Sequence, residues 1–367
     1  MSEMSMRQRM LAVISGGPHD RVPFVQYTGQ APKEEAWALV GRENIGLLQW
    51  TRLHALDHPH CRFETEEISR RGRAGFRRTL HTPEGDLFEE RLYEPGYGSS
   101  AAACHFVKEP EDYRVLLAYL RDIRVRKDLS GYLEADRALG DDGLPHAAVD
   151  RTPFQQLWVQ WVCLEDLCLH LADAPGVMEE VFAALAGIQR RTFEIVVAAA
   201  REVPLSHIDF PDNVTAPVIG RTYFEKHCVA GYNELAGMLS DAARTSSPKS
   251  GLDVPLFSHT DGDLKPLWDL IGQSKLDGLD SLSPPPDNDT PVGLAAEMWP
   301  DMRLWVNFPS SVHLAEPEVM YQTAMEILRQ AGHTGRLQIQ ISENVPAGRW
   351  RVSYPQIVRA IRDFGPI

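Results

Sequence analysis

The chain has 367 residues, of which 43% are apolar and 24% are charged, and its formal net charge is −14. This length and composition are typical of a globular protein with one large domain or two small ones. An acidic surface repels phosphate backbones, so the charge argues against nucleic-acid binding.

The cysteine content and the N-terminal residues indicate the cellular compartment of the protein. Five cysteines form no CxxC pair, which argues against a disulfide framework or a thiolate zinc knuckle and fits a reducing cytoplasm. Residues 1–17 are polar and helix-like, without the apolar core of a secretory signal. Because no run is apolar for the roughly 18 residues of a membrane span, we expect a cytoplasmic protein that does not associate with membranes.

The first half of the chain predicts mixed elements. Residues 22–27 (VPFVQY) follow a Gly-Gly-Pro turn and predict a strand. Residues 75–93 predict a β-hairpin with Pro-Glu-Gly-Asp as its turn, and residues 146–150 predict a short strand. Apolar residues step by three and four along residues 174–200, which predicts a long helix with one buried face.

From residue 205 onward, five apolar runs alternate with amphipathic stretches. The predicted strands cover residues 205–210, 254–259, 278–282, 303–308 and 336–342. The predicted helices follow them at about residues 223–239, from 264, and at 291–298, 317–331 and 355–364. Strict alternation of strand and helix implies a parallel sheet.

With the strands near residues 22 and 146, the strand count comes close to eight. The sequence therefore predicts an α/β fold, a single-domain (β/α)8 TIM barrel, with a doubly wound open sheet as the alternative. Neither GxGxxG nor GxxxxGK[ST] follows a strand, which weakens that alternative. Residues 51–124 contain the hairpin and are predicted to be an insertion that decorates the barrel.

Polar side chains gather where the predicted strands end. In a TIM barrel the active site lies at the C-terminal ends of the strands. Five consecutive units deliver a carboxylate or an amide to that end. The strand-end side chains are Gln26, Tyr27, Gln30, His207, Asp209, Asp212, Asn213, His259, Asp261, Asp263, Asp280, Asn307, Ser342, Glu343 and Asn344.

His259 and Asp261 carry the strongest signal. Residues i and i+2 of an extended chain point to the same face, here the barrel mouth. The pair can share a metal, or the carboxylate can orient the imidazole as a general acid or base. Structural roles stay open for other strand-end residues: His207 could be buried inside the barrel, Asp212 could cap a helix, and Asp280 could pair with a Lys or Arg.

Several segments, in this order and spacing, resemble the uroporphyrinogen decarboxylase superfamily, which also includes corrinoid-dependent methyltransferases. The resemblance covers nearly the whole chain and lies in RVPF at 21–24, TLHTPEGDLFEE at 79–90, residues 207–235, residues 257–282, MRLWVNF at 302–308 and ISENVPAG at 341–348. It implies a (β/α)8 barrel, in agreement with the alternation of strands and helices. It also implies a homodimer, because dimers are frequent in the family.

Missing arginines and the TPEGDL segment at 82–87 favour the methyltransferase branch, from which the chain departs at two metal-ligand positions. The decarboxylases have an early RQAGRY-like segment whose arginines bind substrate carboxylates, whereas VPFVQYTGQAPK at 22–33 lacks them. The methyltransferases typically have His-x-Cys-Gly where this chain has FSHTDGD, and a second Cys after the last strand, which together hold a zinc. The resemblance therefore places His259, Asp261 and Glu343 at the metal-ligand positions. Such a set accepts zinc and also suits Mn or Fe(II).

The sequence thus predicts a metal-assisted methyltransferase that moves a methyl group between a small O-methyl substrate and a corrinoid. No DxHxxG segment with a following Rossmann-like unit is found, so the corrinoid is expected on a separate protein. Asp209, His259 and Asp261 are the predicted catalytic residues. The predicted substrate-binding residues are Tyr27, His207, Asp212, Asn213 and Asn307.

Two alternatives remain. The first is a decarboxylase of a porphyrinogen or another carboxylic acid, in which Asp209 would stabilise a protonated pyrrole-like intermediate. The second is a non-catalytic barrel that binds a ligand. Metal content separates methyl transfer from both alternatives, and binding of a planar tetrapyrrole separates the two alternatives from each other.

Overall fold

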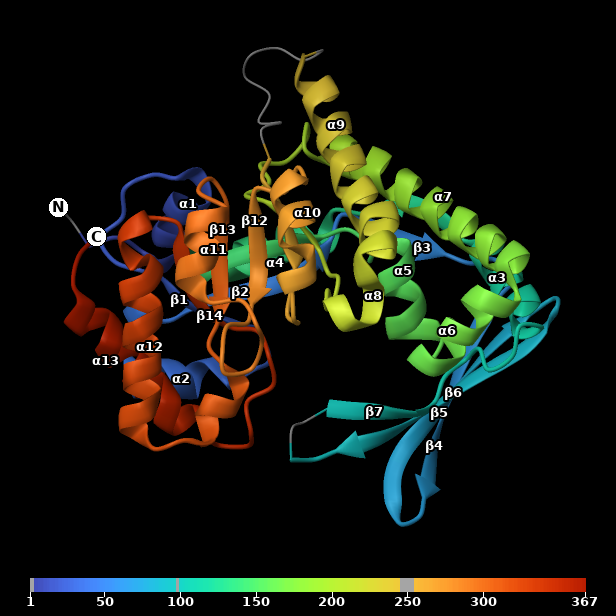
Figure 1. Cartoon of the computed structure of the whole chain (residues 1–367), viewed down its shortest axis with the longest axis horizontal. Coiled ribbons are helices and arrows are strands. Elements are labelled where there is room, and N and C mark those ends of the chain that lie inside the picture. Colours follow the sequence, from blue (N-terminus) through green and yellow to red (C-terminus); the bar gives the residue numbers. More distant parts are fainter. Residues whose placement is uncertain (1–2, 97–98, 245–253) are drawn as a thin grey trace. The chain divides into compact units, whose positions relative to one another are not determined.

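A computed structural model describes residues 3–96, 99–244 and 254–367 (Figure 1). The chain divides into two compact units. The first, here called the barrel unit, comprises Met1–Leu53, Leu129–Val149 and Val197–Ile367. The second, here called the sheet unit, comprises His54–Asp128 and Asp150–Val196.

Eight parallel strands close the barrel in the order β1-β14-β13-β12-β11-β10-β9-β2. The strands are β1 Phe24–Tyr27, β2 Gly46–Arg52, β9 Gly143–Ala148, β10 Ile208–Phe210, β11 Leu256–His259, β12 Gly278–Leu282, β13 Arg303–Asn307 and β14 Leu337–Ile341. The closed parallel barrel confirms the predicted TIM-barrel fold and rules out the open sheet. Strand β2 is the eighth strand, which the sequence pattern did not predict.

Helices follow the strands along the chain. They are α2 Lys33–Val40, α4 Ser130–Leu139, α8 Ala216–Tyr223, α9 Ala230–Arg244, α10 Trp268–Gln273, α11 Val292–Met298, α12 Pro317–Ala331 and α13 Trp350–Phe364. Helix α12 illustrates how the sequence forms these helices. Pro317 occupies its first turn, and its buried residues Met320, Ala324 and Ile327 recur at helical spacing, so that one face packs inward. Helices α11, α12 and α13 lie side by side along one flank of the barrel (Figure 1).

Helix α1, Met6–Ser15, packs against the barrel core. Ser5 caps the helix, because its hydroxyl accepts from the Gln8 backbone N–H at 3.3 Å while the Gln8 side chain accepts from the Ser5 N–H at 2.8 Å. Met6, Met10, Val13 and Ile14 of α1 form one buried cluster with Val25, Leu48, Leu144, Phe257 and Trp305. This cluster fills the barrel interior with side chains and leaves the polar residues nearer the C-terminal strand ends.

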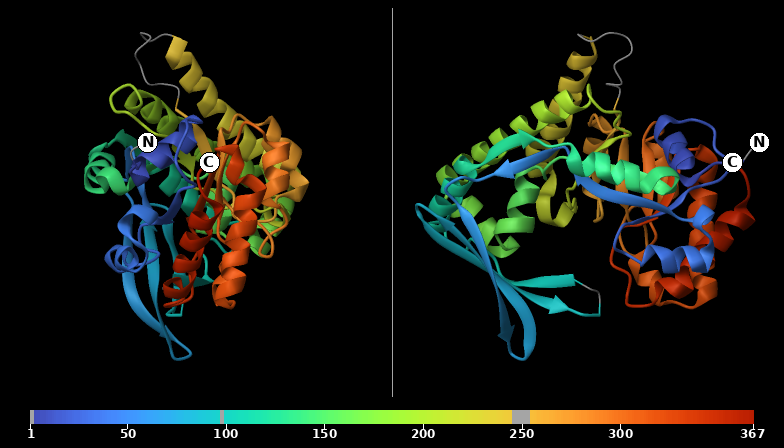
Figure 2. Two further views of the ribbon diagram at one scale, coloured as in Figure 1. Left: turned by 90° about the vertical axis from the view of Figure 1, so that its left-hand side faces the viewer. Right: turned by 180° about the vertical axis from the view of Figure 1, so that it is seen from behind.

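The sheet unit is built around four antiparallel strands, β4 Arg62–Arg70, β5 Arg73–Thr82, β6 Gly85–Glu94 and β7 Ser99–Cys104. Figure 2 shows β4, β5 and β6 as long, twisted strands. The predicted hairpin is the β5–β6 pair, in which Thr82 pairs with Gly85. The unit also contains the pair β3 His54–Asp57 and β8 Arg124–Lys127, with α3 Asp112–Asp122, α5 Pro153–Gln156, α6 Leu164–Asp173 and most of α7 Pro175–Ala199.

The sheet unit overlaps most of the predicted insertion at residues 51–124. It also contains residues 150–196, which the sequence pattern placed in the barrel. The predicted helix at 174–200 matches α7. Across the three described ranges, we find no helix whose length and apolar character would suit it to crossing a membrane.

Candidate functional site

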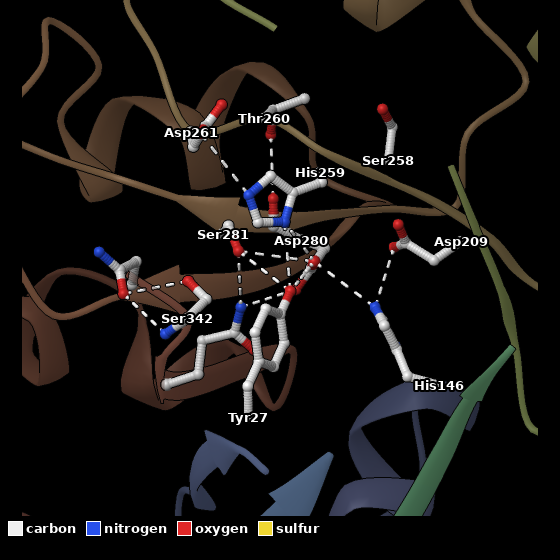
Figure 3. Close-up of polar contacts among 12 residues, drawn as sticks. Tyr27, His146, Asp209, Ser258, His259, Thr260, Asp261, Asp280, Ser281 and Ser342 are labelled. Carbon is white, nitrogen blue, oxygen red and sulfur yellow. Dashed lines mark hydrogen bonds and ion pairs between the residues drawn. The ribbon is translucent and has the colours of Figure 1, made fainter. Parts of the chain in front are cut away.

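Five barrel strands each place a polar side chain inside the upper part of the barrel (Figure 3). These residues are Tyr27 on β1, His146 on β9, Asp209 on β10, His259 on β11 and Asp280 on β12. All five are buried, and His146, Asp209 and Asp280 are fully buried. Such a concentration of ionisable groups in a dry interior is costly unless each group finds a partner, so the contacts among them define what the site can do.

Asp280 is the centre of the hydrogen-bond network. Its Oδ2 accepts from the Tyr27 hydroxyl and lies 3.0 Å from His259 Nδ1, and its Oδ1 accepts from Gln340 Nε2 at 2.6 Å. Burial alone would raise the pKa of Asp280, but the nearby rings of His146 and His259 hold it well below its usual range. Asp280 is therefore a buried carboxylate in its charged form.

A register irregularity in β12, of the kind that a β-bulge makes, accompanies the contacts of both Asp280 and Ser281 with the Tyr27 hydroxyl. Consecutive strand residues normally point to opposite faces. Here the β12–β13 register shifts between Leu279 and Leu282, and Ser281 has a left-handed φ of 60°. The Ser281 hydroxyl also reaches the Tyr27 hydroxyl, at 3.3 Å. Bulges of this kind re-aim side chains and recur beside active sites.

His259 links the interior of the barrel to its mouth. Its Nδ1 faces Asp280, and its Nε2 lies 3.7 Å from Asp261 Oδ2 and 3.6 Å from Glu343 Oε1. Burial would lower the pKa of His259, but the surrounding carboxylates of Asp261, Asp280 and Glu343 raise it well above its usual value. The ring is thus held between an inner carboxylate and two outer ones.

The two outer carboxylates, Asp261 and Glu343, differ in solvent exposure and in their hydrogen-bond partners. Asp261 accepts a hydrogen bond from Asn213 Nδ2 at 2.8 Å, and its backbone carbonyl accepts from Asn288 Nδ2 at 2.7 Å. Burial would raise the pKa of Asp261, but His259 and Asn213 lower it below its usual value. The Glu343 side chain is 36% exposed, so this side of the cluster opens to solvent.

The predicted metal set is close enough in space to hold one ion. The ligand atoms of His259, Asp261 and Glu343 all lie within 4.8 Å of one another. Separations of 3.6 and 3.7 Å are too long for hydrogen bonds. Around a tetrahedral ion with bonds of about 2.1 Å, neighbouring ligand atoms stand about 3.4 Å apart. The donor set and its spacing therefore fit a divalent metal, and its binding stays a prediction.

A second cluster lies deeper and was not predicted. It consists of His146, Asp209 and Asp280, whose ligand atoms also lie within 4.8 Å of one another. His146 Nε2 is 3.7 Å from Asp209 Oδ2 and 3.6 Å from Asp280 Oδ2. Burial lowers the pKa of His146 despite Asp280, whereas burial and the Asp280 charge raise the pKa of Asp209 well above its usual value.

His146 was not predicted as a site residue because the predicted strand began three residues too late. The predicted strand covers residues 146–150, which puts His146 at the N-terminal end, away from the barrel mouth. Strand β9 runs from Gly143 to Ala148, and its third residue is Pro145. Proline is unusual inside a strand, so the predicted strand begins after Pro145. The corrected boundary moves His146 toward the C-terminal half of the strand.

The remaining predicted site residues have structural partners. His207 is fully buried, its Nε2 lies 2.6 Å from His146 Nδ1, and burial holds its pKa well below the usual value. This is the barrel-interior position that the sequence left open for it. Asp212 is also buried and accepts from the Tyr232 hydroxyl at 2.8 Å. Asn307 Oδ1 accepts from the Ser342 backbone N–H and hydroxyl, both at 3.1 Å, and so anchors the segment before Glu343.

These placements leave the substrate-binding roles of Tyr27, His207, Asp212, Asn213 and Asn307 as predictions. Asn213 contacts a predicted metal ligand directly, and Tyr27 contacts both Asp280 and His259. Burial, followed by the charges of Asp280 and Asp209, raises the pKa of Tyr27 well above its usual value, which keeps its hydroxyl protonated.

Comparison with known proteins supports the fold. No family model matches the chain, and no curated protein matches it. Among solved structures, a methyltransferase from Methanosarcina mazei matches with a TM-score of 0.53 at 13% identity, covering 99% of both chains. A B12-independent methionine synthase from a Shewanella species matches with a TM-score of 0.43 at 11% identity, covering 90% of this chain and 84% of that one. The first match shows a shared fold along the whole chain.

Proposed function

We propose that this barrel is a metal-assisted methyltransferase that moves a methyl group between a small O-methyl substrate and a corrinoid on a separate protein. The observation that carries the proposal is the position of His259 Nε2, which faces Asp261 and Glu343 at 3.7 and 3.6 Å. The shared fold with a methyltransferase from Methanosarcina mazei supports the reaction class.

The residues around His259 orient it as a ligand. In the metal-bound form, a single proton on Nδ1, donated to Asp280 Oδ2, would leave the Nε2 lone pair directed at the barrel mouth. Asn213 fixes the Asp261 carboxylate, and Asn307 fixes Ser342, the residue before Glu343. Because these supports are already in place, the three donor atoms need little rearrangement to bind an ion.

The donor set suits an oxygen-containing substrate. A bound divalent ion would supply Lewis acidity at an ether oxygen. In the proposed reaction the methyl C–O bond breaks, its electron pair stays on oxygen, and that oxygen takes up a proton. A reduced corrinoid on the separate protein would supply the electron pair that accepts the methyl group. One imidazole and two carboxylates make a harder site than thiolates would, which favours oxygen over sulfur.

The decarboxylase alternative needs cationic groups to bind several substrate carboxylates. The polar contacts described for His259 are three carboxylates and the Tyr27 hydroxyl, and the Trp50 ring lies 6.4 Å from its ring. Asp209, which would stabilise a pyrrole-like cation, is fully buried. We therefore prefer methyl transfer.

Metal content and methyl transfer test the proposal together. The wild-type chain is loaded with Zn²⁺, then mixed with reduced cobalamin and a panel of methyl ethers, and methylcobalamin is followed by its absorbance. We expect product with the wild type and none with His259→Ala. The matched control is His333→Ala, because His333 is exposed on the short helix Gly332–Thr334.

Elemental analysis of the same samples separates the parts of the proposal. Bound zinc that is reduced in His259→Ala supports the ligand set. A wild-type chain that contains no metal and takes up none on titration would contradict it. Metal binding without methyl transfer to cobalamin from any ether in the panel would leave the site in place and contradict the proposed reaction.

A further inference from the structure

The inner cluster places His146 Nε2 between one carboxylate oxygen of Asp209 and one of Asp280, at 3.7 and 3.6 Å. Neither carboxylate oxygen of Asp209 has a hydrogen-bond partner among the described residues, and the same is true of His146 Nε2. All three atoms are buried, and Figure 3 shows His146 pointing toward both Asp209 and Asp280. We propose that His146, Asp209 and Asp280 form a second, fully buried site for a divalent metal ion.

The missing hydrogen bonds are the first support for this site. A buried carboxylate with no donor is strongly disfavoured, so a native protein supplies a hydrogen bond, a proton or a cation. Asp280 accepts hydrogen bonds from Tyr27 and Gln340, whereas Asp209 is without one inside the described part of the chain. A single cation between the two carboxylates would satisfy Asp209 and His146 together.

The distances are the second support. His146 Nε2 lies 3.7 Å from Asp209 Oδ2 and 3.6 Å from Asp280 Oδ2. Both separations are too long for a hydrogen bond, and both are close to the spacing of about 3.4 Å between ligands that share a tetrahedral ion. The outer set around His259 shows the same two distances. The inner atoms therefore have a spacing that fits ligands of one shared ion.

The ring partners of His146 are the third support. Its Nδ1 lies 2.6 Å from His207 Nε2, and His207 Nδ1 lies 2.9 Å from the Ser206 hydroxyl. A proton on His207 Nδ1 and another on His146 Nδ1 satisfy this chain of contacts. The same arrangement leaves His146 Nε2 as a bare lone pair facing the two carboxylates. A histidine that donates its far nitrogen to a neighbour is typical of metal ligands.

Charge and donor type define the ion. Two carboxylates and one divalent cation sum to no net charge, which suits a site without solvent. One imidazole and two carboxylates favour zinc, manganese or iron(II) over calcium or magnesium. Asp280 would bind the inner ion and also accept from His259, so it connects the two sites. The inner site does not depend on the proposed reaction.

Counting ions tests the inner site. The full chain is expressed with added zinc, and bound Zn²⁺ is measured for the wild type, His259→Ala, Asp209→Asn and the double variant. We expect two ions per chain in the wild type, one in each single variant and none in the double variant. Chelation should remove the outer ion first, because Glu343 is partly exposed while every inner ligand is buried. His146→Gln replaces Asp209→Asn if that variant fails to fold, as judged by circular dichroism.

Anomalous diffraction at the zinc edge on the wild-type protein places the ions without relying on variants. A peak between His146 Nε2, Asp209 and Asp280 supports the proposal. One ion per chain, lost in His259→Ala and kept in Asp209→Asn, overturns the inner site and leaves the proposed function standing. One ion lost in Asp209→Asn and kept in His259→Ala supports the inner site and contradicts the outer ligand set. A metal-free chain overturns both.

Discussion

Asp280 Oδ2 lies 3.0 Å from His259 Nδ1, although 21 residues separate the two in the sequence. The contact joins neighbouring strands, because His259 and Asp280 are register partners of β11 and β12. It fixes the orientation of an imidazole whose other nitrogen faces the barrel mouth. Asp280 is itself fixed by Tyr27 and Gln340. The inner carboxylate therefore determines how His259 presents itself to a ligand.

Replacing Asp280 should weaken metal binding at the outer site without removing a ligand from it. Asp280→Asn keeps the size of the side chain but removes the charge that orients and polarises His259. Loss of such a partner typically lowers metal affinity by about 10–100-fold. Competition with a chromophoric chelator measures the Kd for Zn²⁺ in the Asp209→Asn background, where the proposed inner ion is absent and only the outer site contributes. Asp301→Asn, at an exposed position, is the matched control. An affinity equal to that of the control would contradict the orienting role.

The fold could be predicted because each strand–helix unit carries its own local signal. The predicted strand at 278–282 and the predicted helix at 317–331 match β12 and α12 in both boundaries. Strand β2 could not be predicted in this way. Its sequence GLLQWTR mixes apolar and polar residues, and it becomes a strand through parallel pairing with β1 and β9. That pairing is a tertiary effect which overrides local pattern.

The site could be predicted only in part. His259 and Asp261 follow from i, i+2 spacing at a strand end, and Glu343 follows from the family resemblance. Asp280 stood out as a strand carboxylate, but the sequence did not indicate that Ser281 joins the same network through the irregular part of β12. A left-handed serine has no reliable sequence signal, because such a conformation is uncommon for any residue except glycine. His146 was missed because Pro145 hid the true start of β9.

Closure of the barrel depends on the close approach of β2 and β9. A Cβ atom at Gly143 would lie 2.0 Å from the Leu47 carbonyl oxygen, which is backbone and cannot move aside cheaply. We expect Gly143→Ala to lower the free energy of unfolding by about 1–3 kcal/mol, the usual cost of overpacking. Gly131→Ala, in helix α4, is the matched control, since nothing lies within 4 Å of its Cβ position.

Urea unfolding followed by circular dichroism measures both variants. The control should be as stable as the wild type or slightly more stable, because alanine favours a helix over glycine. Equal stabilities of Gly143→Ala and Gly131→Ala would mean that β2 and β9 can separate without penalty.

The sheet unit should lose stability in acid through Glu90. This residue of β6 accepts from Arg70 Nε at 2.9 Å and from Arg77 at 2.6 Å, and its side chain is 10% exposed. Hydrogen bonds from Arg70 and Arg77 lower the pKa of Glu90 from 4.5 to about 2. Because the folded pKa is the lower one, the stabilising contribution is present above pH 4.5 and is lost as the pH falls toward 2.

The comparison of wild type with Glu90→Gln isolates this contribution. Thermal unfolding at a series of pH values should give the wild type a higher Tm near neutral pH. The difference should shrink steadily as the pH is lowered from 4.5 toward 2. A difference that stays constant over that interval would show that the charge of Glu90 contributes nothing and that the variant differs only in packing.

Exchanging the outer carboxylates for thiols should change which ion the site prefers. Asp261→Cys with Glu343→Cys converts one imidazole and two carboxylates into one imidazole and two thiolates. Thiolates are soft ligands, so affinity for Cd²⁺ should rise and affinity for Mn²⁺ should fall. Equilibrium dialysis of each ion against the wild-type chain and the double variant measures the two Kd values. Asp209 and His146 are untouched, so any ion held by the inner cluster serves as an internal reference. If the ratio of the Cd²⁺ and Mn²⁺ affinities is unchanged, then Asp261 and Glu343 do not bind the ion, and His259 faces them as one charged group among ion pairs.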